Sequence, residues 1–120
     1  MRNIVALRRY CFALDLQNDP QKIAEYVNWH KPENARPAIT ESIRSAGIEN
    51  MEIYLTGNRL LMVVDVNEHF CAEKKAAADK ANPDVIAWEE LMNNYQQVLP
   101  WAAPGEKWVK MDLIYSLPQD

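Results

Sequence analysis

The stretch NMEIYLTGNRLLMVVDV, residues 50–66, decides the fold of this chain. Apolar residues recur at alternate positions on both sides of the short polar segment TGNR, a pattern typical of two β-strands. Gly57 and Asn58 suit the tight turn between them, so the stretch predicts a β-hairpin. The second strand is apolar on both of its faces, with Leu60, Met62, Val64 and Val66 alternating with Leu61 and Val63. Helices of the same chain can cover one face, and the other face needs a different cover.

The chain before the hairpin begins with another strand and a helix. The segment RRYCFALDLQ, residues 8–17, alternates as a strand does. Asp19 and Pro20 suit the N-cap and the first turn of a helix. Pro32 keeps the residue before it out of helical geometry, so this helix should end near His30.

The remaining segments complete a recognisable order of elements. A second helix is predicted over residues 37–46, with Gly47 as the left-handed residue that ends it. After the hairpin come a polar, alanine-rich helix at 67–79 and a stronger helix at 81–100. The segment 107–118 alternates as a closing strand. The order is therefore β-α-α-β-β-α-α-β, which reduces to β-α-β-β-α-β when each pair of helices is treated as one connection.

This order predicts an α+β fold of the ferredoxin-like split βαβ type. It has an antiparallel four-stranded sheet with helices on one face. A length of 120 residues suits one compact domain, so we treat residues 1–120 as a single domain. Because the strand at 59–66 is apolar on both faces, helices on one face leave an apolar face open. A second copy packed sheet against sheet would cover that face, which predicts a homodimer.

Composition argues against several classes of protein. The net charge is −4, and the most basic run, EKKAAADK at 73–80, is interrupted by acidic residues, which argues against nucleic-acid binding. No apolar run approaches the length of a membrane span. Cys11 and Cys71 lie in no CxxC or metal-ligand spacing, so we expect both to be reduced. The first ten residues do not look like a signal peptide. We expect a cytoplasmic protein.

A candidate site lies in AEYVNWHKPENARP, residues 24–37. Tyr26 and His30 are four residues apart, so they lie on one face of the predicted helix and can contact one small ligand together. His30 is also at the helix C-terminus, where the helix dipole favours the imidazolium form by about 0.3–1 kcal/mol. This position favours a role as a proton donor near neutral pH. Two packed core residues would show the same spacing, so spacing alone leaves both interpretations open.

Several segments, in this order and at this spacing, resemble those of one family. They are EYVNWHKP (25–32), Gly47 with NMEIYL (50–55), RLLMVVDV (59–66), AWEELM (87–92) and the closing strand. Over nearly its whole length the chain is similar to the L-rhamnose mutarotase family. The resemblance implies a small dimeric α/β barrel that interconverts the α and β anomers of a deoxy-sugar. It also implies that neither a metal nor a cofactor takes part.

The resemblance assigns roles to particular residues. It implies that His30 is the catalytic proton donor and that Tyr26, one turn earlier, contacts the sugar and assists it. In the late helix it implies a pair of tryptophans, of which this chain keeps Trp88 and has Glu89 in place of the second. Met51 stands where the family has an aromatic sugar contact. These two departures make L-fucose as serious a candidate substrate as L-rhamnose.

Two points stay open at this stage. Tyr54 and Glu89 are candidate contacts for sugar hydroxyls, although Tyr54 could fill a face of the sheet and Glu89 could face solvent. The broad architecture also hosts haem-degrading and cofactor-free monooxygenases, and a sugar-binding dimer without catalysis is a further alternative.

Overall fold

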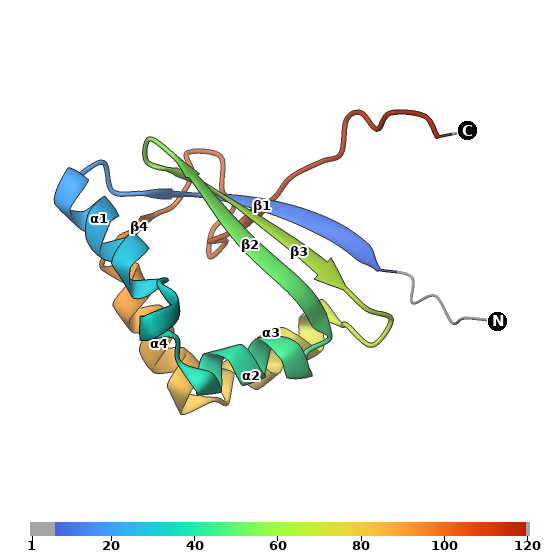
Figure 1. The fold of residues 1–120 in the computed structure, drawn as a ribbon, viewed down its shortest axis with the longest axis horizontal. Helices are drawn as coiled ribbons and strands as arrows, with labels where there is room; N and C mark the ends of the chain where they lie inside the picture. The colour runs from blue at the N-terminus through green and yellow to red at the C-terminus, as the bar shows by residue number, and fades with distance from the viewer. Residues whose placement is uncertain (1–6, 120) are drawn as a thin grey trace.

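The computed structural model describes residues 7–119 as one antiparallel sheet with helices on one of its faces (Figure 1). Three long strands, β1 (Arg8–Leu16), β2 (Ile48–Thr56) and β3 (Arg59–Val66), carry most of the sheet. Two short strands, β4 (Gln96–Gln97) and β5 (Val109–Lys110), both pair with the outer edge of β1. The order β2-β3-β1-β4 confirms the predicted ferredoxin-like split βαβ arrangement. The fourth position of the sheet is shared by β4, which lies within the predicted helix over 81–100, and β5, which lies within the predicted closing strand over 107–118.

The helices form the second layer. They are α1 (Pro20–Trp29), α2 (Pro37–Ser45), α3 (Ala72–Lys80) and α4 (Pro83–Asn93), with a short 3-10 turn, η1, at Pro32–Asn34. In Figure 1 all four α-helices lie on the same side of the sheet. This confirms the predicted two-layer arrangement.

The hairpin forms as predicted. Thr56 pairs with Arg59 across the turn, and Gly57 has a positive φ of 56°. This register aligns β2 and β3 with β1 so that Met62 lies between Phe12 and Ile53. These three side chains therefore share the face that the helices cover, because side chains alternate between the two faces of a strand.

Helix α1 begins and ends where the sequence predicts. The Asp19 side chain accepts a hydrogen bond of 2.9 Å from the backbone N–H of Gln21, and Pro20 occupies the first turn. His30 is the C-cap. On this helix Tyr26 is buried, whereas the next residue, Val27, is exposed.

The predicted helix over 67–79 begins later than expected, at Ala72. Asn67 holds the preceding residues in a turn instead. Its backbone N–H donates to the Gly47 carbonyl at 2.8 Å, and its side-chain oxygen accepts from the backbone N–H of His69 at 2.9 Å. Side-chain bonds of this kind compete with helix formation.

The predicted helix over 81–100 ends early, at Asn93. Its apolar spacing continues to Tyr95 and Leu99, and both of these residues are buried. However, the backbone after Asn93 pairs with β1: the N–H of Gln17 donates to the Tyr95 carbonyl at 2.8 Å, and Gln96 pairs with Leu16. Pairing with a distant strand overrides the local helical period.

The predicted closing strand over 107–118 is also shorter than expected. Only Val109–Lys110 is a strand, and the last bond to β1 runs from the N–H of Met111 to the Cys11 carbonyl at 2.8 Å. The chain then leaves the sheet and extends away from it (Figure 1). Leu113 and Ile114 are 84% and 94% exposed. An extended segment becomes a strand only when a neighbour pairs with it, and in the described part of this chain the segment has none.

Gly47 is a glycine that the fold requires. Its φ is 97°, and a Cβ there would lie 2.6 Å from the Asn67 side-chain oxygen and 3.0 Å from the Phe70 backbone nitrogen. Gly57 also has a positive φ, but a Cβ there would meet nothing within 4 Å. An added Cβ would therefore cause both backbone strain and steric overlap at Gly47, but backbone strain alone at Gly57.

We expect Gly47→Ala to lower the free energy of unfolding by about 3 kcal/mol or more, since it adds overlap to strain. Gly57→Ala should cost about 1 kcal/mol from strain alone. Urea denaturation of both variants measures the difference. Equal losses of unfolding free energy in the two variants would show that the close contacts around Gly47 add nothing to the cost of the substitution.

Candidate active site

A cavity of about 350 Å³ lies between the sheet and the helices. Its volume lies in the range of small-molecule sites. The sheet side of the cavity is apolar and comes from all three long strands, with Phe12, Met51, Ile53, Met62 and Val64 among its residues. Most of the polar groups come from the helices, and Gln96 of β4 adds an amide. A ligand in this cavity would therefore have one apolar side and one polar side.

Tyr26 is the buried phenol of the cavity. Its side chain projects from α1, the residue is 3% exposed, and its hydroxyl accepts a hydrogen bond of 3.2 Å from Nε2 of Gln96. Burial raises the pKa of Tyr26, the bond from Gln96 lowers it, and the charge of Glu89 raises it, with a net increase. Tyr26 therefore stays a neutral phenol well into the alkaline range.

His30 lies beside Tyr26 with one ring nitrogen fixed. Its Nδ1 is 2.7 Å from the backbone carbonyl oxygen of Tyr26. A carbonyl oxygen only accepts hydrogen bonds, so Nδ1 carries a hydrogen and donates it. Nε2 is then the nitrogen that can exchange a proton with a ligand. The His30 ring centroid is 4.4 Å from that of Tyr26.

Trp88 forms the next part of the wall. Its ring meets the His30 ring edge-on, with centroids 5.5 Å apart. The guanidinium of Arg36 lies 5.0 Å from the Trp88 ring centroid and 5.5 Å from that of Trp29. Arg36 comes from the proline-containing connection between α1 and α2. Its cation–π contacts connect α1 to α4 beside the imidazole.

Glu89 places a carboxylate on the rim of the same cavity. Its Oε2 accepts a hydrogen bond of 2.6 Å from Nζ of Lys107, and its side chain is 48% exposed. Lys107 lies shortly before β5, so this ion pair connects the C-terminal part of the chain to α4. The second oxygen of the carboxylate can accept a hydrogen bond from a ligand hydroxyl.

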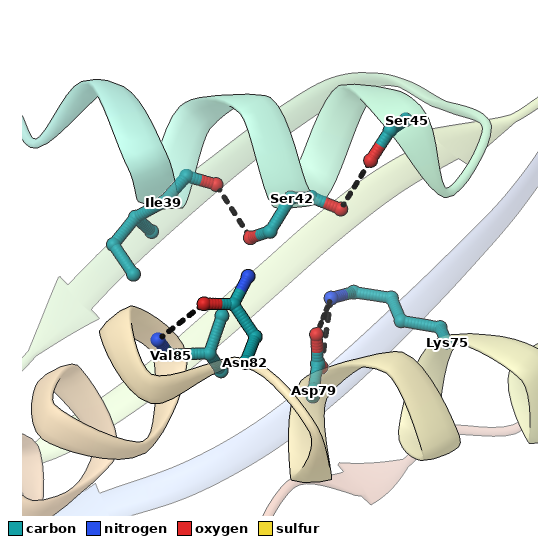
Figure 2. Close-up of polar contacts among 7 residues, drawn as sticks. All are labelled: Ile39, Ser42, Ser45, Lys75, Asp79, Asn82 and Val85. Atoms are coloured by element: carbon teal, nitrogen blue, oxygen red, sulfur yellow. Dashed lines mark hydrogen bonds and ion pairs between the residues drawn. The ribbon is translucent and has the colours of Figure 1, made fainter.

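The far end of the cavity has polar groups that are already paired (Figure 2). Nζ of Lys75 donates to both carboxylate oxygens of Asp79, at 2.9 and 2.8 Å. The hydroxyl of Ser42 donates to the backbone carbonyl of Ile39 at 2.7 Å. All four of these residues line the cavity. Each of these hydrogen bonds stays within one helix, α2 or α3, so the polar groups at this end are paired locally.

The structure brings five of the six predicted site residues to one cavity: Tyr26, His30, Met51, Trp88 and Glu89. Tyr54 lies elsewhere. It pairs with Leu61, on the face of the sheet away from the helices, and is 54% exposed. Its hydroxyl donates to a carboxylate oxygen of Glu52 at 3.3 Å.

Three further residues belong to the site without having been predicted there. Gln96 and Trp108 line the cavity, and Arg36 supports Trp88. Gln96 reaches the cavity because β4 pairs with β1, and no local sequence signal marks such a short strand. Trp108 carried a weak signal as an aromatic residue near a Pro-Gly turn.

Other groups with reactive side chains do not form a second site. His69 is exposed, and its Nε2 lies 3.6 Å from Oε1 of Glu68. Cys11 and Cys71 are free thiols, as expected. Within residues 7–119, no group of three or more His, Cys, Asp or Glu side chains could hold a metal ion. No helix in that part of the chain is long and apolar enough to cross a membrane.

The fold and the cavity together define a class: an α+β protein of ferredoxin-like topology with a buried phenol and an imidazole side by side at a cavity of small-molecule size. Residues 9–117 match the sequence profile of the family described as L-rhamnose mutarotase. The chain belongs to this family and is therefore an isomerase.

Named relatives agree with this assignment. An L-fucose mutarotase from Xanthomonas campestris pv. campestris is 40% identical over 115 residues, which covers 96% of this chain and 92% of that protein. A UPF0734 protein from Dictyostelium discoideum is 35% identical, covering 92% and 90% of the two chains. The crystal structure of an L-rhamnose mutarotase from Formosa agariphila superposes with a TM-score of 0.66, at 16% identity, over 92% of this chain and 99% of that one. That likeness shows the fold.

The burial of Tyr26 predicts a dependence of stability on pH. Because its pKa is raised in the folded protein, the folded state holds the phenol proton more tightly than the unfolded state does. This contribution is fully present below the unfolded pKa of about 10 and is lost as pH rises through the folded pKa. The Tyr26→Phe variant has no phenol proton at this position, so it lacks this pH dependence of stability.

We therefore expect the stability difference between wild type and Tyr26→Phe to move in favour of the variant above about pH 10. Urea denaturation at a series of pH values measures it. Below that pH the difference should stay constant, which is the internal control. A difference that stays constant above that pH as well would contradict the raised pKa.

Proposed function

We propose that this isomerase interconverts the α and β anomers of a 6-deoxy-hexose, L-fucose or L-rhamnose, by acid–base ring opening. The observation that carries the proposal is the fixed orientation of His30: Nδ1 is bound to the Tyr26 carbonyl, and Nε2 remains free at a sugar-sized cavity. The family assignment supports the reaction. The 40% identical relative, named as an L-fucose mutarotase, favours L-fucose as the first substrate to test.

The proposed reaction moves two protons and breaks one bond. His30, as imidazolium, donates a proton from Nε2 to the ring oxygen while the anomeric hydroxyl gives its proton to a solvent water at the rim of the cavity. The bond between the anomeric carbon and the ring oxygen breaks, and the anomeric carbon becomes an aldehyde. After rotation about the adjacent carbon–carbon bond, the reverse transfers close the ring as the other anomer. A positioned acid of this kind contributes a rate factor of roughly 10²–10⁴.

The remaining cavity residues bind and orient the sugar in this proposal. Tyr26 hydrogen-bonds to the sugar and assists the proton transfer. Trp88 presents its aromatic surface to an apolar face of the ring, and Glu89 accepts a hydrogen bond from a hydroxyl. Met51, with the apolar residues of the sheet, contacts the methyl group that distinguishes a 6-deoxy-hexose. This arrangement fits the division of the cavity into an apolar side and a polar side.

The two alternatives have less support. A monooxygenase of the same architecture and a sugar-binding dimer without catalysis both fit the fold, but the family match and the named relatives favour the mutarotase. The cytoplasmic location is part of the proposal, and the two free thiols are compatible with a reducing compartment.

We expect His30→Ala to reduce the catalysed rate of anomer exchange by roughly 10²–10⁴, since it removes the proton donor. Saturation-transfer NMR of L-fucose and L-rhamnose, with and without enzyme, measures the rate. His69→Ala is the matched control, because His69 is exposed and outside the cavity. It should keep wild-type activity.

Three results would count against His30 as the proton donor or against the proposed mutarotase activity. Full activity in His30→Ala would remove His30 from the mechanism. Equal losses in both histidine variants would point to a general effect of the substitutions. Binding of a sugar to the wild-type protein without faster anomer exchange would support the non-catalytic alternative.

We also propose that the protein is a homodimer, as the sequence predicts. Leu61 and Val63 are only partly covered on the open face of the sheet. The C-terminal segment after Met111 adds a run of exposed apolar side chains, namely Leu113, Ile114, Tyr115 and Leu117. Such a run in an extended segment suits pairing and packing against a second copy.

Ile114→Asp tests the dimer. A charge at this exposed apolar position should weaken association, so the mass by light scattering should fall from twice 13.9 kDa towards 13.9 kDa. Val27→Asp changes an exposed apolar residue on α1 and should leave the mass unchanged. A monomeric wild-type protein, or dimers in both variants, would contradict the proposed role of the segment.

A further inference from the structure

Gln96 is held in the site by strand pairing. It lies in β4 opposite Leu16, which is fully buried beneath the helices. Side chains of paired residues lie on the same face of a sheet, so Gln96 faces the helices and lines the cavity. The next residue, Gln97, is opposite Asp15 and is exposed. Two adjacent glutamines therefore have opposite environments.

The Gln96 amide is only half satisfied. Its Nε2 donates to the Tyr26 hydroxyl at 3.2 Å, whereas its Oε1 is buried and has no hydrogen-bond partner among residues 7–119. Buried polar atoms without a partner are rare and destabilising. A methionine at this position would fill similar space without that cost. Stability therefore does not explain a glutamine here.

The orientation of the amide determines the orientation of the Tyr26 proton. An amide N–H can only donate, so the phenol oxygen acts as the acceptor in this bond and its own hydrogen is directed elsewhere. Turning the amide over would place Oε1 against the hydroxyl and bury the amide hydrogens where Oε1 now lies. Unpaired buried N–H groups are rarer than unpaired carbonyls, which favours the observed orientation.

The Tyr26 proton is then available to a ligand. The hydrogen bonds of the described residues include no acceptor for it. Two of the charged groups of the cavity already have partners, since Glu89 binds Lys107 and Lys75 binds Asp79. Sugar oxygens are hydrogen-bond acceptors, so a phenol proton held in this direction meets a ligand that can accept it.

We infer that Gln96 is a positioning residue of the isomerase, which holds the Tyr26 hydroxyl so that it donates a hydrogen bond to the sugar. The inference rests on the proposed function and deepens it. Tyr26 and Nε2 of His30 together then present two donors to neighbouring oxygens of one substrate. A donor oriented in advance needs no reorganisation during the reaction, which is the basis of electrostatic stabilisation in enzymes.

The test is a double-mutant cycle measured by saturation-transfer NMR. Gln96→Met removes the amide and keeps the volume, and Gln97→Met is the control on the exposed face. We expect Gln96→Met to lower the rate at saturating sugar roughly tenfold, the value of one hydrogen bond to a reacting group. Gln97→Met should change it less than twofold. Circular dichroism and thermal melting verify that each variant is folded.

Tyr26→Phe then distinguishes positioning from packing. If Gln96 acts through the Tyr26 hydroxyl, Gln96→Met should add little to the loss in a Tyr26→Phe background. Multiplied losses, or a fully active Gln96→Met, would overturn the inference and leave the mutarotase proposal intact. A wild-type protein that accelerates exchange of neither sugar would overturn the proposed function and this inference with it.

Discussion

The register of the three long strands is the constraint on which the cavity depends. The turn at Gly57 aligns Thr56 with Arg59, and pairing with β1 then places Met62 between Phe12 and Ile53. Side chains alternate between the faces of a sheet, so a slip of the hairpin by one residue against β1 would move Met62 and Ile53 to the open face. Leu61 and Val63 of β3 would then lie beneath the helices together with Glu52 and Tyr54 of β2, and a carboxylate would replace part of the apolar side of the cavity. The hairpin therefore determines both the fold and the shape of the site.

The end of helix α1 couples the fold to the chemistry. Pro32 stops the helix, and His30 becomes its C-cap. At a helix end some backbone carbonyls have no N–H partner. The imidazole supplies one for the Tyr26 carbonyl, at 2.7 Å. The same bond that caps the helix fixes the ring and leaves Nε2 for the ligand, so a local rule about proline determines which nitrogen is free to react.

The sequence predicts those features that depend on neighbouring residues. The turn of the hairpin, the N-cap at Asp19 and the placement of Tyr26 beside His30 all follow from residues four positions apart or fewer. The departures come from distant contacts. Asn67 delays α3 by bonding to Gly47, and the residues after Asn93 leave the helical path to pair with β1. Gln96 enters the site through that pairing, which is why no sequence pattern identifies it.

The two proton-exchanging groups differ in their contact with water, and the difference fits the proposed reaction. Tyr26 is buried, and burial keeps it neutral, so it serves as a fixed donor that does not exchange its charge state. His30 is exposed at the rim of the cavity, where its Nε2 can regain or lose a proton to solvent between turnovers. Mutarotation consumes no proton overall, but each turnover begins from the same protonation state. One buried group that holds its proton and one accessible group that renews it meet that requirement without a metal or a cofactor in the proposed mechanism.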